Sequence, residues 1–173
     1  MKKIELSTEV FVYEDLNELQ DIERKLLGLA EDAHEKAYAP YSKFLVGCSV
    51  LLDNGEILNG ANQENAAFPA CICAERTVLS AAASLYNNVK PVMLAVVVKN
   101  LNKEHQNPAA PCGECRQYIF ELENRYKSEI PIIMKAESNK IYKVASASLL
   151  LPLAFSQKEL ISISQHLKLA FHK

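Results

Sequence analysis

The chain has 173 residues, 49% of them hydrophobic and 23% charged, with a formal net charge of −2, which is the size and composition of one globular domain. This slight acidity excludes a general electrostatic hold on nucleic acid or on an anionic membrane, because both need a basic face. The longest apolar runs, residues 93–98 and 149–155, are too short to span a bilayer and the first residues lack a signal-peptide core, so we expect a cytoplasmic protein.

The first elements predicted along the chain are an arm and a helix. Apolar and polar residues alternate over the first dozen positions, which predicts a short strand or an ordered arm. We therefore divide the chain into an N-terminal arm (residues 1–14) and one domain (residues 15–173). Leucine, isoleucine and alanine then recur with helical spacing, which predicts an amphipathic helix over residues 15–37. Pro40 is expected to end this helix.

A hairpin is predicted next. Residues 44–52 and 56–60 are strand-like, and they flank the tripeptide Asp53-Asn54-Gly55. This is a strong turn signal, because Asn and Gly tolerate the backbone conformations that tight hairpin turns require.

Helices and apolar strands alternate through the rest of the chain. This alternation predicts an α/β fold, a three-layer α/β/α sandwich, and the hairpin makes its sheet mixed, with mostly five strands. The expected elements are a helix from about residue 73 to 85, a buried strand at 91–99, a helix at 112–126, strands at 130–135 and 141–144, and a closing amphipathic helix at 157–171.

The five cysteines are unevenly distributed. Cys71 and Cys73 form one group, Cys112 and Cys115 form another, and Cys48 stands alone in a strand-like stretch. In a reducing cytosol this pattern favours metal binding or catalysis over a disulfide framework.

The two cysteine groups together predict a zinc site. Cys112 and Cys115 stand three apart at an expected helix start, where i and i+3 share a face and the thiolate is stabilised. Cys73 begins the other helix and supplies a third ligand. Three protein ligands leave the fourth position of one Zn²⁺ open to water, as in catalytic sites. The spacing matches the H-x-E…P-C-x-x-C pattern of zinc nucleobase deaminases, in its three-cysteine variant.

Two charged residues follow Cys73. Glu75 is the expected catalytic residue, because a carboxylate facing the water can accept its proton and pass it to a substrate. Three thiolates and Zn²⁺ sum to −1, and Arg76 could offset this charge by hydrogen-bonding to a thiolate. The alternatives are a structural zinc site with Cys71 as fourth ligand, or a C-x-x-C without function.

Beyond these motifs, the chain resembles the small homotetrameric cytidine deaminases from about residue 16 to residue 160. Several separate matches in the right order and spacing make the resemblance specific. They are Pro40-Tyr41-Ser42-Lys43-Phe44 with Val46-Gly47, Asn62-Gln63-Glu64-Asn65-Ala66, Cys73-Ala74-Glu75-Arg76-Thr77, residues 111–117, and Leu151-Pro152 with Phe155.

The resemblance implies a zinc-dependent hydrolase that deaminates cytidine and 2′-deoxycytidine in pyrimidine salvage, with one zinc per chain and sites shared between the subunits of a homotetramer. It implies no nucleic-acid or membrane partner. The implied substrate contacts are Phe44 against the nucleoside, Asn62 and Glu64 on the ribose 3′-hydroxyl, the backbone of Ala66 and Ala74 on the polar edge of the pyrimidine, and Phe155 of a neighbouring subunit on the base.

Plainer interpretations exist for several of these residues. Phe44 and Phe155 could be core aromatics, Asn62 a turn residue and Glu64 a solvated charge. The chain also departs from the family, with Phe68 where tyrosine is common and Glu114 where a small residue is usual. We expect Cys48 and Cys71 to be buried, and the four histidines, which have no motif around them, to be exposed or packing residues.

Three functions compete. The first is deamination of a free nucleoside. The second is deamination of a nucleotide, of an antibiotic such as blasticidin S, or of a base in RNA or DNA, but polynucleotides call for a basic groove with stacking aromatics and the chain is acidic without tryptophan. The third is a non-catalytic, zinc-stabilised binding protein, which would not explain Glu75 beside the metal ligands.

Overall fold

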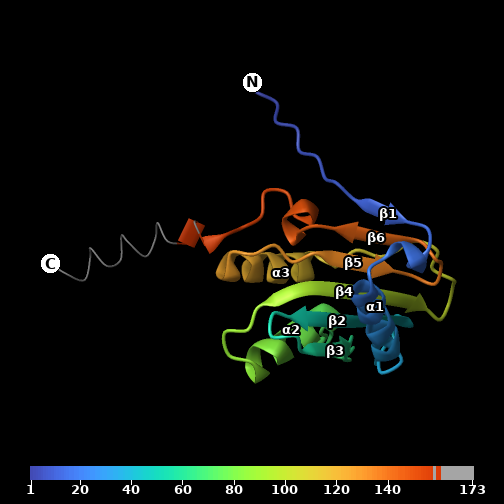
Figure 1. The fold of residues 1–173 in the computed structure, drawn as a ribbon. Helices are drawn as coiled ribbons and strands as arrows, with labels where there is room; N and C mark the ends of the chain where they lie inside the picture. Colours follow the sequence, from blue (N-terminus) through green and yellow to red (C-terminus); the bar gives the residue numbers. More distant parts are fainter. Residues whose placement is uncertain (158, 161–173) are drawn as a thin grey trace.

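The computed structural model describes residues 1–157, 159 and 160. Most of the helix predicted at 157–171 lies outside these residues. The elements are β1 (Phe11–Tyr13), α1 (Asp21–His34), β2 (Phe44–Leu52), β3 (Ile57–Ala61), α2 (Ala74–Leu85), β4 (Pro91–Asn100), α3 (Gly113–Tyr126), β5 (Ile132–Lys135) and β6 (Ile141–Val144) (Figure 1). No helix in the described ranges is long and apolar enough to cross a membrane.

The strands form one mixed sheet in the order β1-β6-β5-β4-β2-β3. β4 and β5 are parallel, and every other neighbouring pair is antiparallel. The predicted mixed sheet is confirmed, with six strands rather than mostly five. The additional strand is β1, which comes from the N-terminal arm and pairs Phe11 with Lys143 and Tyr13 with Ile141. The arm before β1 projects away from the sheet (Figure 1).

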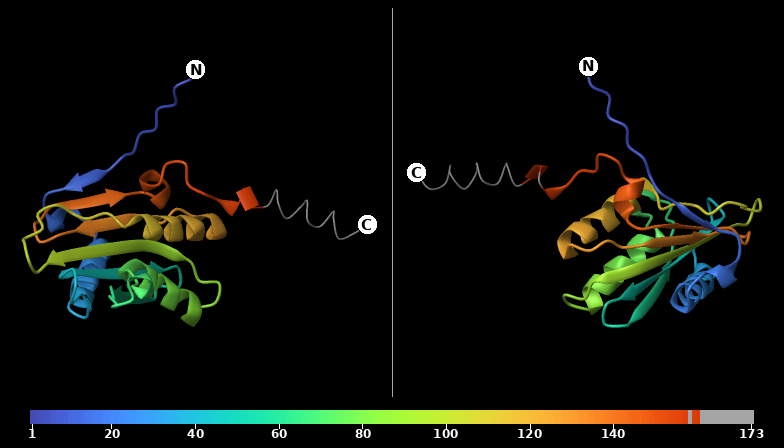
Figure 2. Two further views of the ribbon diagram at one scale, coloured as in Figure 1. Left: turned by 180° about the vertical axis from the view of Figure 1, so that it is seen from behind. Right: turned by 45° about the horizontal axis from the view of Figure 1, so that its top comes forward.

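Helices cover both faces of the sheet, which confirms the three-layer α/β/α sandwich (Figure 2). On one face, α1 packs Leu26, Leu27 and Ala30 against Val97 and Ile133 of the central strands. On the other face, α2 and α3 enclose a second apolar cluster that includes alternate residues of β2, β4 and β5. The central strand β4 is therefore buried on both faces, as its continuous apolar run predicts.

The first helix is shorter than the 15–37 predicted from its apolar spacing. Asp15 caps a single 3₁₀ turn over Leu16–Glu18, after which Gln20 is extended and caps α1 from Asp21. At the other end, α1 ends at His34, well before Pro40, so the proline is not what ends this helix. The reason is tertiary, because the backbone N–H of Tyr38 donates to Asn62 O beyond the hairpin and draws the chain into an extended path.

The remaining predicted elements are close to those observed. The hairpin turn has Gly55 at φ 86°, a conformation that suits glycine. The two helices on the second face begin one residue after a cysteine, since Cys73 caps α2 and Cys112 caps α3, both with extended backbone. The fold thus brings two helix N-termini, each starting at a cysteine, to the same face of the sheet.

Candidate active site

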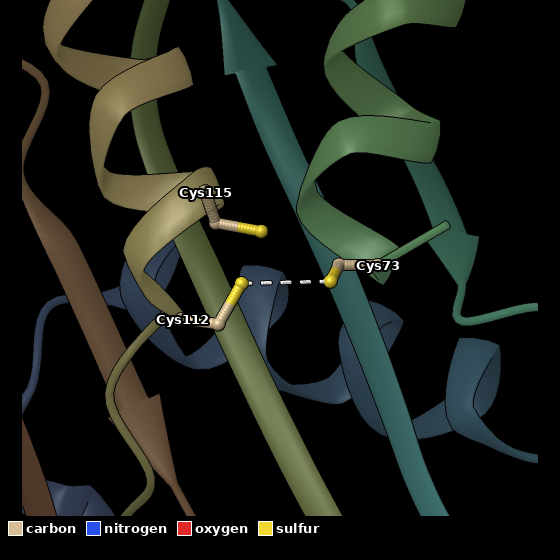
Figure 3. A group of neighbouring side chains, drawn as sticks. All are labelled: Cys73, Cys112 and Cys115. Atoms are coloured by element: carbon tan, nitrogen blue, oxygen red, sulfur yellow. Dashed lines mark hydrogen bonds between the residues drawn. The ribbon is translucent and has the colours of Figure 1, made fainter. Parts of the chain in front are cut away.

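Three cysteine sulfurs meet where α2 and α3 begin. Cys73 and Cys112 are the N-caps of the two helices, and Cys115 lies on the first turn of α3. Figure 3 shows the three side chains pointing toward one another, and their sulfurs lie within 4.8 Å of each other. The Sγ atoms of Cys73 and Cys112 are 3.6 Å apart.

This cluster fits one zinc ion. Zn–S bonds of about 2.3 Å in tetrahedral geometry place two sulfurs about 3.8 Å apart, close to the spacing of Cys73 and Cys112. Three thiolates suit zinc better than hard cations, which prefer oxygen ligands. Among the described residues, the cluster does not include Cys71. Its Sγ instead accepts a hydrogen bond from the Asn65 N–H at 3.2 Å. This argues against the four-cysteine structural alternative.

The protonation of the thiols favours metal binding. A hydrogen bond from the Cys115 thiol is the largest of the effects that together lower the pKa of Cys73 to about 7. A hydrogen bond with Cys112 and the charge of Arg76 act in the same direction, whereas burial and the charge of Glu75 oppose them. The hydrogen bond with Cys73 and burial raise the pKa of Cys115. Near neutral pH the cluster therefore holds thiolate character on Cys73, which is the form that binds metal.

Glu75 is a buried acid next to these thiols. It lies in the first turn of α2, and only 4% of its surface is exposed. Burial raises the pKa of its carboxyl above the ordinary value, although hydrogen bonds from its own backbone N–H and from Cys115 oppose the shift. A carboxyl of this kind is suited to exchange protons with a neighbour.

The cluster and Glu75 border a pocket of about 300 Å³. Its apolar walls come from β2, β4 and the loop before α3, and its polar groups come from the segment after β3 and from the helix starts. Among the expected site residues, the lining includes Phe44, Asn62, Glu64, Cys73, Glu75 and Cys112. The pocket thus brings together residues from four separate motifs.

Asn62 and Glu64 are held firmly at the pocket wall. Asn62 Oδ1 accepts from the Val46 N–H at 2.8 Å, and Nδ2 donates to Phe44 O at 3.0 Å. Glu64 Oε2 accepts from the N–H groups of Tyr41 and Ser42 at 2.9 and 3.3 Å. Desolvation is the largest single effect on Glu64 and raises its pKa, but the hydrogen bonds from Ser42 and Tyr41 and the charge of Lys43 together outweigh it and lower the pKa of the carboxyl. Glu64 is therefore a carboxylate at neutral pH.

Arg76 has a partner that the sequence did not predict. Its Nη1 donates to Glu114 Oε2 at 2.6 Å, so the two residues tie the start of α2 to the start of α3. The positive charge of Arg76 still lowers the pKa of Cys73. The expected hydrogen bond from Arg76 to a thiolate stays a prediction.

Besides Arg76, four expected residues lie outside the lining of the pocket. Ala74 is fully buried in the first turn of α2, between Cys73 and Glu75, whereas Ala66 is exposed. Cys115 is buried behind the pocket with its sulfur in the cluster. Phe155 is 56% exposed, and its carbonyl accepts from Gln117 Nε2 at 2.9 Å.

Sequence reasoning missed some of the lining. Cys71 was expected to be buried, but it is partly exposed and lines the pocket, so that expectation was wrong; Cys48 is buried as predicted. Ala109 and Ala110, in the loop before α3, also line the pocket. The position of Cys71, two residues before the expected metal ligand Cys73, was the signal that could have predicted its place in the lining.

The chain is similar to proteins of known family. The family described as "Cytidine and deoxycytidylate deaminase zinc-binding region" matches residues 20–130. A relative named cytidine deaminase, from Sporosarcina psychrophila, is 38% identical over 140 residues, which cover 81% of this chain and 95% of the relative.

Solved structures agree with this match. The crystal structure of cytidine deaminase from Burkholderia pseudomallei has a TM-score of 0.67 at 38% identity and covers 79% of this chain and 100% of that chain. The crystal structure of cytidine deaminase from Mycobacterium tuberculosis has a TM-score of 0.60 at 30% identity, covering 80% of this chain and 99% of that chain.

Proposed function

Because the chain belongs to the cytidine deaminase family, we propose that its pocket binds free cytidine and 2′-deoxycytidine and converts them to uridine and 2′-deoxyuridine. The observation that carries the proposal is the buried carboxylate of Glu75, which borders the same pocket as thiols that fit one zinc ion. The reaction is a step of pyrimidine salvage. We further propose a cytoplasmic location, because five free cysteines suit a reducing compartment.

Glu75 is the proposed proton carrier. Cys73, Cys112 and Cys115 would hold the zinc ion, which would supply the Lewis acidity that makes water nucleophilic near neutral pH. The Glu75 carboxylate accepts protons from the attacking water and delivers one to the ring nitrogen and the other to the leaving amino group. A carbon–oxygen bond forms and the carbon–nitrogen bond breaks, so ammonia leaves. Burial raises the pKa of Glu75 and so helps it to hold a proton between these transfers.

The opposite wall of the pocket is proposed to bind the nucleoside. Glu64 is a carboxylate fixed by two backbone N–H groups, and it has lone pairs left to accept from the ribose 3′-hydroxyl. Asn62 Nδ2 uses one N–H on Phe44 O, which leaves its second N–H for the ribose. Phe44 offers an apolar ring to the nucleoside, and the backbone of Ala66 and Ala74 would meet the polar edge of the pyrimidine.

The test of the function is a Glu75→Gln variant assayed with cytidine and deoxycytidine by absorbance. The amide keeps the shape of the side chain but cannot carry protons, so kcat should fall by about 10²- to 10⁴-fold while zinc content stays at one per chain. Glu56→Gln is the matched control, since Glu56 is exposed at the hairpin turn. A Glu75→Gln protein that keeps more than about a tenth of the activity would contradict the proton-carrier role.

We propose that free nucleosides are preferred over their 5′-phosphates. No lysine or arginine lines the pocket in the described part of the chain, while Glu64 adds a negative charge to it. Lys43, beside Phe44, is the nearest basic residue in sequence, and its charge acts on Glu64. Burying a phosphate without a compensating charge is unfavourable by several kcal/mol. The measurement is the ratio of kcat/KM for cytidine and CMP, with blasticidin S as a third substrate. A ratio near one, or one that favours CMP or the antibiotic, would assign the site to another deaminase class.

We also propose a homotetramer in which Phe155 of one subunit stacks on the base bound by another. Phe155 does not line the pocket of its own chain, and Leu153 beside it is 90% exposed. Phe68, on the loop before α2, is a further large apolar residue at the surface. Where exposed apolar side chains form one contiguous patch, they are typical of surfaces that bind a partner.

Subunit mixing tests the shared site. Phe155→Ala should raise KM, whereas Phe11→Ala, which changes an exposed phenylalanine on β1, should not. Mixing Phe155→Ala chains with Glu75→Gln chains should restore some sites that combine an intact Glu75 with an intact Phe155. A monomer by light scattering, or no recovery of activity on mixing, would refute the proposal.

A further inference from the structure

The loop between β4 and α3 contacts the pocket in two ways. Its Ala109 and Ala110 form part of the pocket lining. Nearer to β4, the ring of His105 packs edge-to-face against the ring of Phe44, with centroids 5.5 Å apart and an interplanar angle of 86°. The Leu101 N–H also donates to Lys43 O, next to Phe44, at 2.9 Å. The loop therefore packs against the aromatic wall of the pocket.

One acidic residue outside the pocket holds this loop in place. Glu137 follows β5, and its Oε2 accepts from the His105 N–H at 2.8 Å and from the Asn100 N–H at 3.5 Å. In the other direction, the Glu137 N–H donates to His105 O at 3.2 Å. Ser138 adds a hydrogen bond from its hydroxyl to Gln106 O. Both backbone polar groups of His105 are thus bonded to Glu137.

The charge on Glu137 strengthens this attachment. The hydrogen bond from the His105 N–H lowers the pKa of the Glu137 carboxyl, slight burial opposes the shift, and the Asn100 N–H and the charge of Lys99 lower it further. At neutral pH the acceptor is a carboxylate, and hydrogen bonds to a charged acceptor are stronger than neutral ones.

Phe44 is consequently constrained from two directions. Asn62 fixes its backbone by accepting from Val46 N–H and donating to Phe44 O. His105 packs against its ring from the loop. Without the second contact, the ring could rotate about its side-chain torsions while the strand remained in place.

We propose that Glu137 and His105 are positioning residues for substrate binding: Glu137 fastens the β4–α3 loop, and His105 thereby holds the Phe44 ring in the orientation that receives the nucleoside. The proposal rests on the proposed function of the pocket. Neither residue touches the substrate in it, so both act through Phe44. Their effect is expected on KM, with little effect on the proton transfers at Glu75.

The first experiment compares His105→Ala, His105→Phe and the matched control Glu104→Ala, which changes an exposed residue of the same loop. Aromatic pairs contribute about 0.5 to 1.5 kcal/mol, so His105→Ala should raise the KM for cytidine by about 2- to 10-fold with kcat within about twofold. His105→Phe keeps the edge-to-face contact and should restore a low KM. Equal KM values for His105→Ala and wild type, or a loss in kcat alone, would overturn the proposal.

The second experiment tests whether Glu137 acts through His105. Glu137→Ala should raise KM on its own but should add little in the His105→Ala background, because no ring remains to be positioned. Glu137→Gln keeps a carbonyl acceptor and should lie between wild type and Glu137→Ala. Fully additive effects of Glu137→Ala and His105→Ala would refute the shared route.

Amide hydrogen exchange separates this inference from the proposed function, because it needs no turnover. Exchange at Asn100 and His105 should be about 3- to 10-fold faster in Glu137→Ala than in wild type, with unchanged zinc content. Unchanged exchange at these amides would overturn the fastening role even if the protein deaminates cytidine. Faster exchange in a protein that deaminates no cytidine would instead refute the function and leave the fastening in place.

Discussion

We expect the substitution Gly47→Ala, which adds one methyl group, to destabilise the fold strongly. Gly47 lies in β2, between Ala61 of β3 and Val97 of β4, with α1 packed directly over it. A Cβ built on Gly47 would lie 1.9 Å from Ala30 O and 2.6 Å from His34 N. Both contacts are with backbone atoms, so no side-chain rotation can relieve them.

The size of the effect follows from this geometry. Cβ contacts below 3.0 Å essentially do not occur, so Gly47→Ala would push α1 away from the sheet by about 1 Å. That movement loosens the buried contacts of Leu26, Leu27 and Ala30 with the central strands. Overpacking typically destabilises by about 1 to 3 kcal/mol, and we expect the upper part of that range or more.

The same displacement should reach the pocket. α1 leads into the segment that carries Tyr41 and Ser42, whose backbone N–H groups hold the Glu64 carboxylate. Gly47→Ala should therefore raise the KM for cytidine as well as lower the free energy of unfolding.

The assay is denaturant unfolding of the zinc-loaded protein, with Gly28→Ala as the matched control. Gly28 is exposed in α1 with nothing within 4 Å of its added Cβ, so alanine should stabilise that helix by about 0.5 to 1 kcal/mol. The same substitution is thus expected to have opposite signs at the two positions. An unfolding midpoint for Gly47→Ala at or above that of wild type would refute the reasoning.

Three further results are expected. Elemental analysis should find strong zinc loss in Cys112→Ala and full zinc in Cys71→Ala, and equal loss in both would indicate a four-cysteine structural site. Glu114→Gln should change the free energy of unfolding by less than about 1 kcal/mol in thermal melts, because the Glu114 side of its ion pair with Arg76 is exposed, and a larger loss would contradict this. Glu137 has a lowered pKa, so its carboxylate stabilises the fold above the unfolded value of about 4.3, and this contribution is lost as the pH falls through the lower folded pKa. The difference in unfolding free energy between wild type and Glu137→Gln should thus be constant from pH 7 to about 5 and shrink at lower pH, and a difference that grows with acid would be inconsistent with this sign.

Local patterns in the sequence were sufficient for the layers of the fold and for the chemistry of the metal centre. The apolar run over residues 91–98 of β4 predicts a strand buried on both faces, because the polar residues of the strand, Lys99 and Asn100, come only at its end. The turn at Gly55 and the spacing of Cys112 and Cys115 are also predicted from local sequence, since each depends on a few consecutive residues. The zinc deaminase pattern predicts that Cys73 and Cys112 belong to one site. The fold explains this prediction, because α2 and α3 begin at the same edge of the pocket.

Contacts between distant segments could not be read from the chain in the same way. The early end of α1 depends on Tyr38 bonding to Asn62, the sixth strand depends on the arm meeting β6, and the partner of Arg76 depends on where α3 starts. The histidines were expected to be exposed or packing residues, and the fold alone brings His105 against the ring of Phe44. Such pairings join residues tens of positions apart, so they are set by how the layers pack and leave no periodic signal in the sequence.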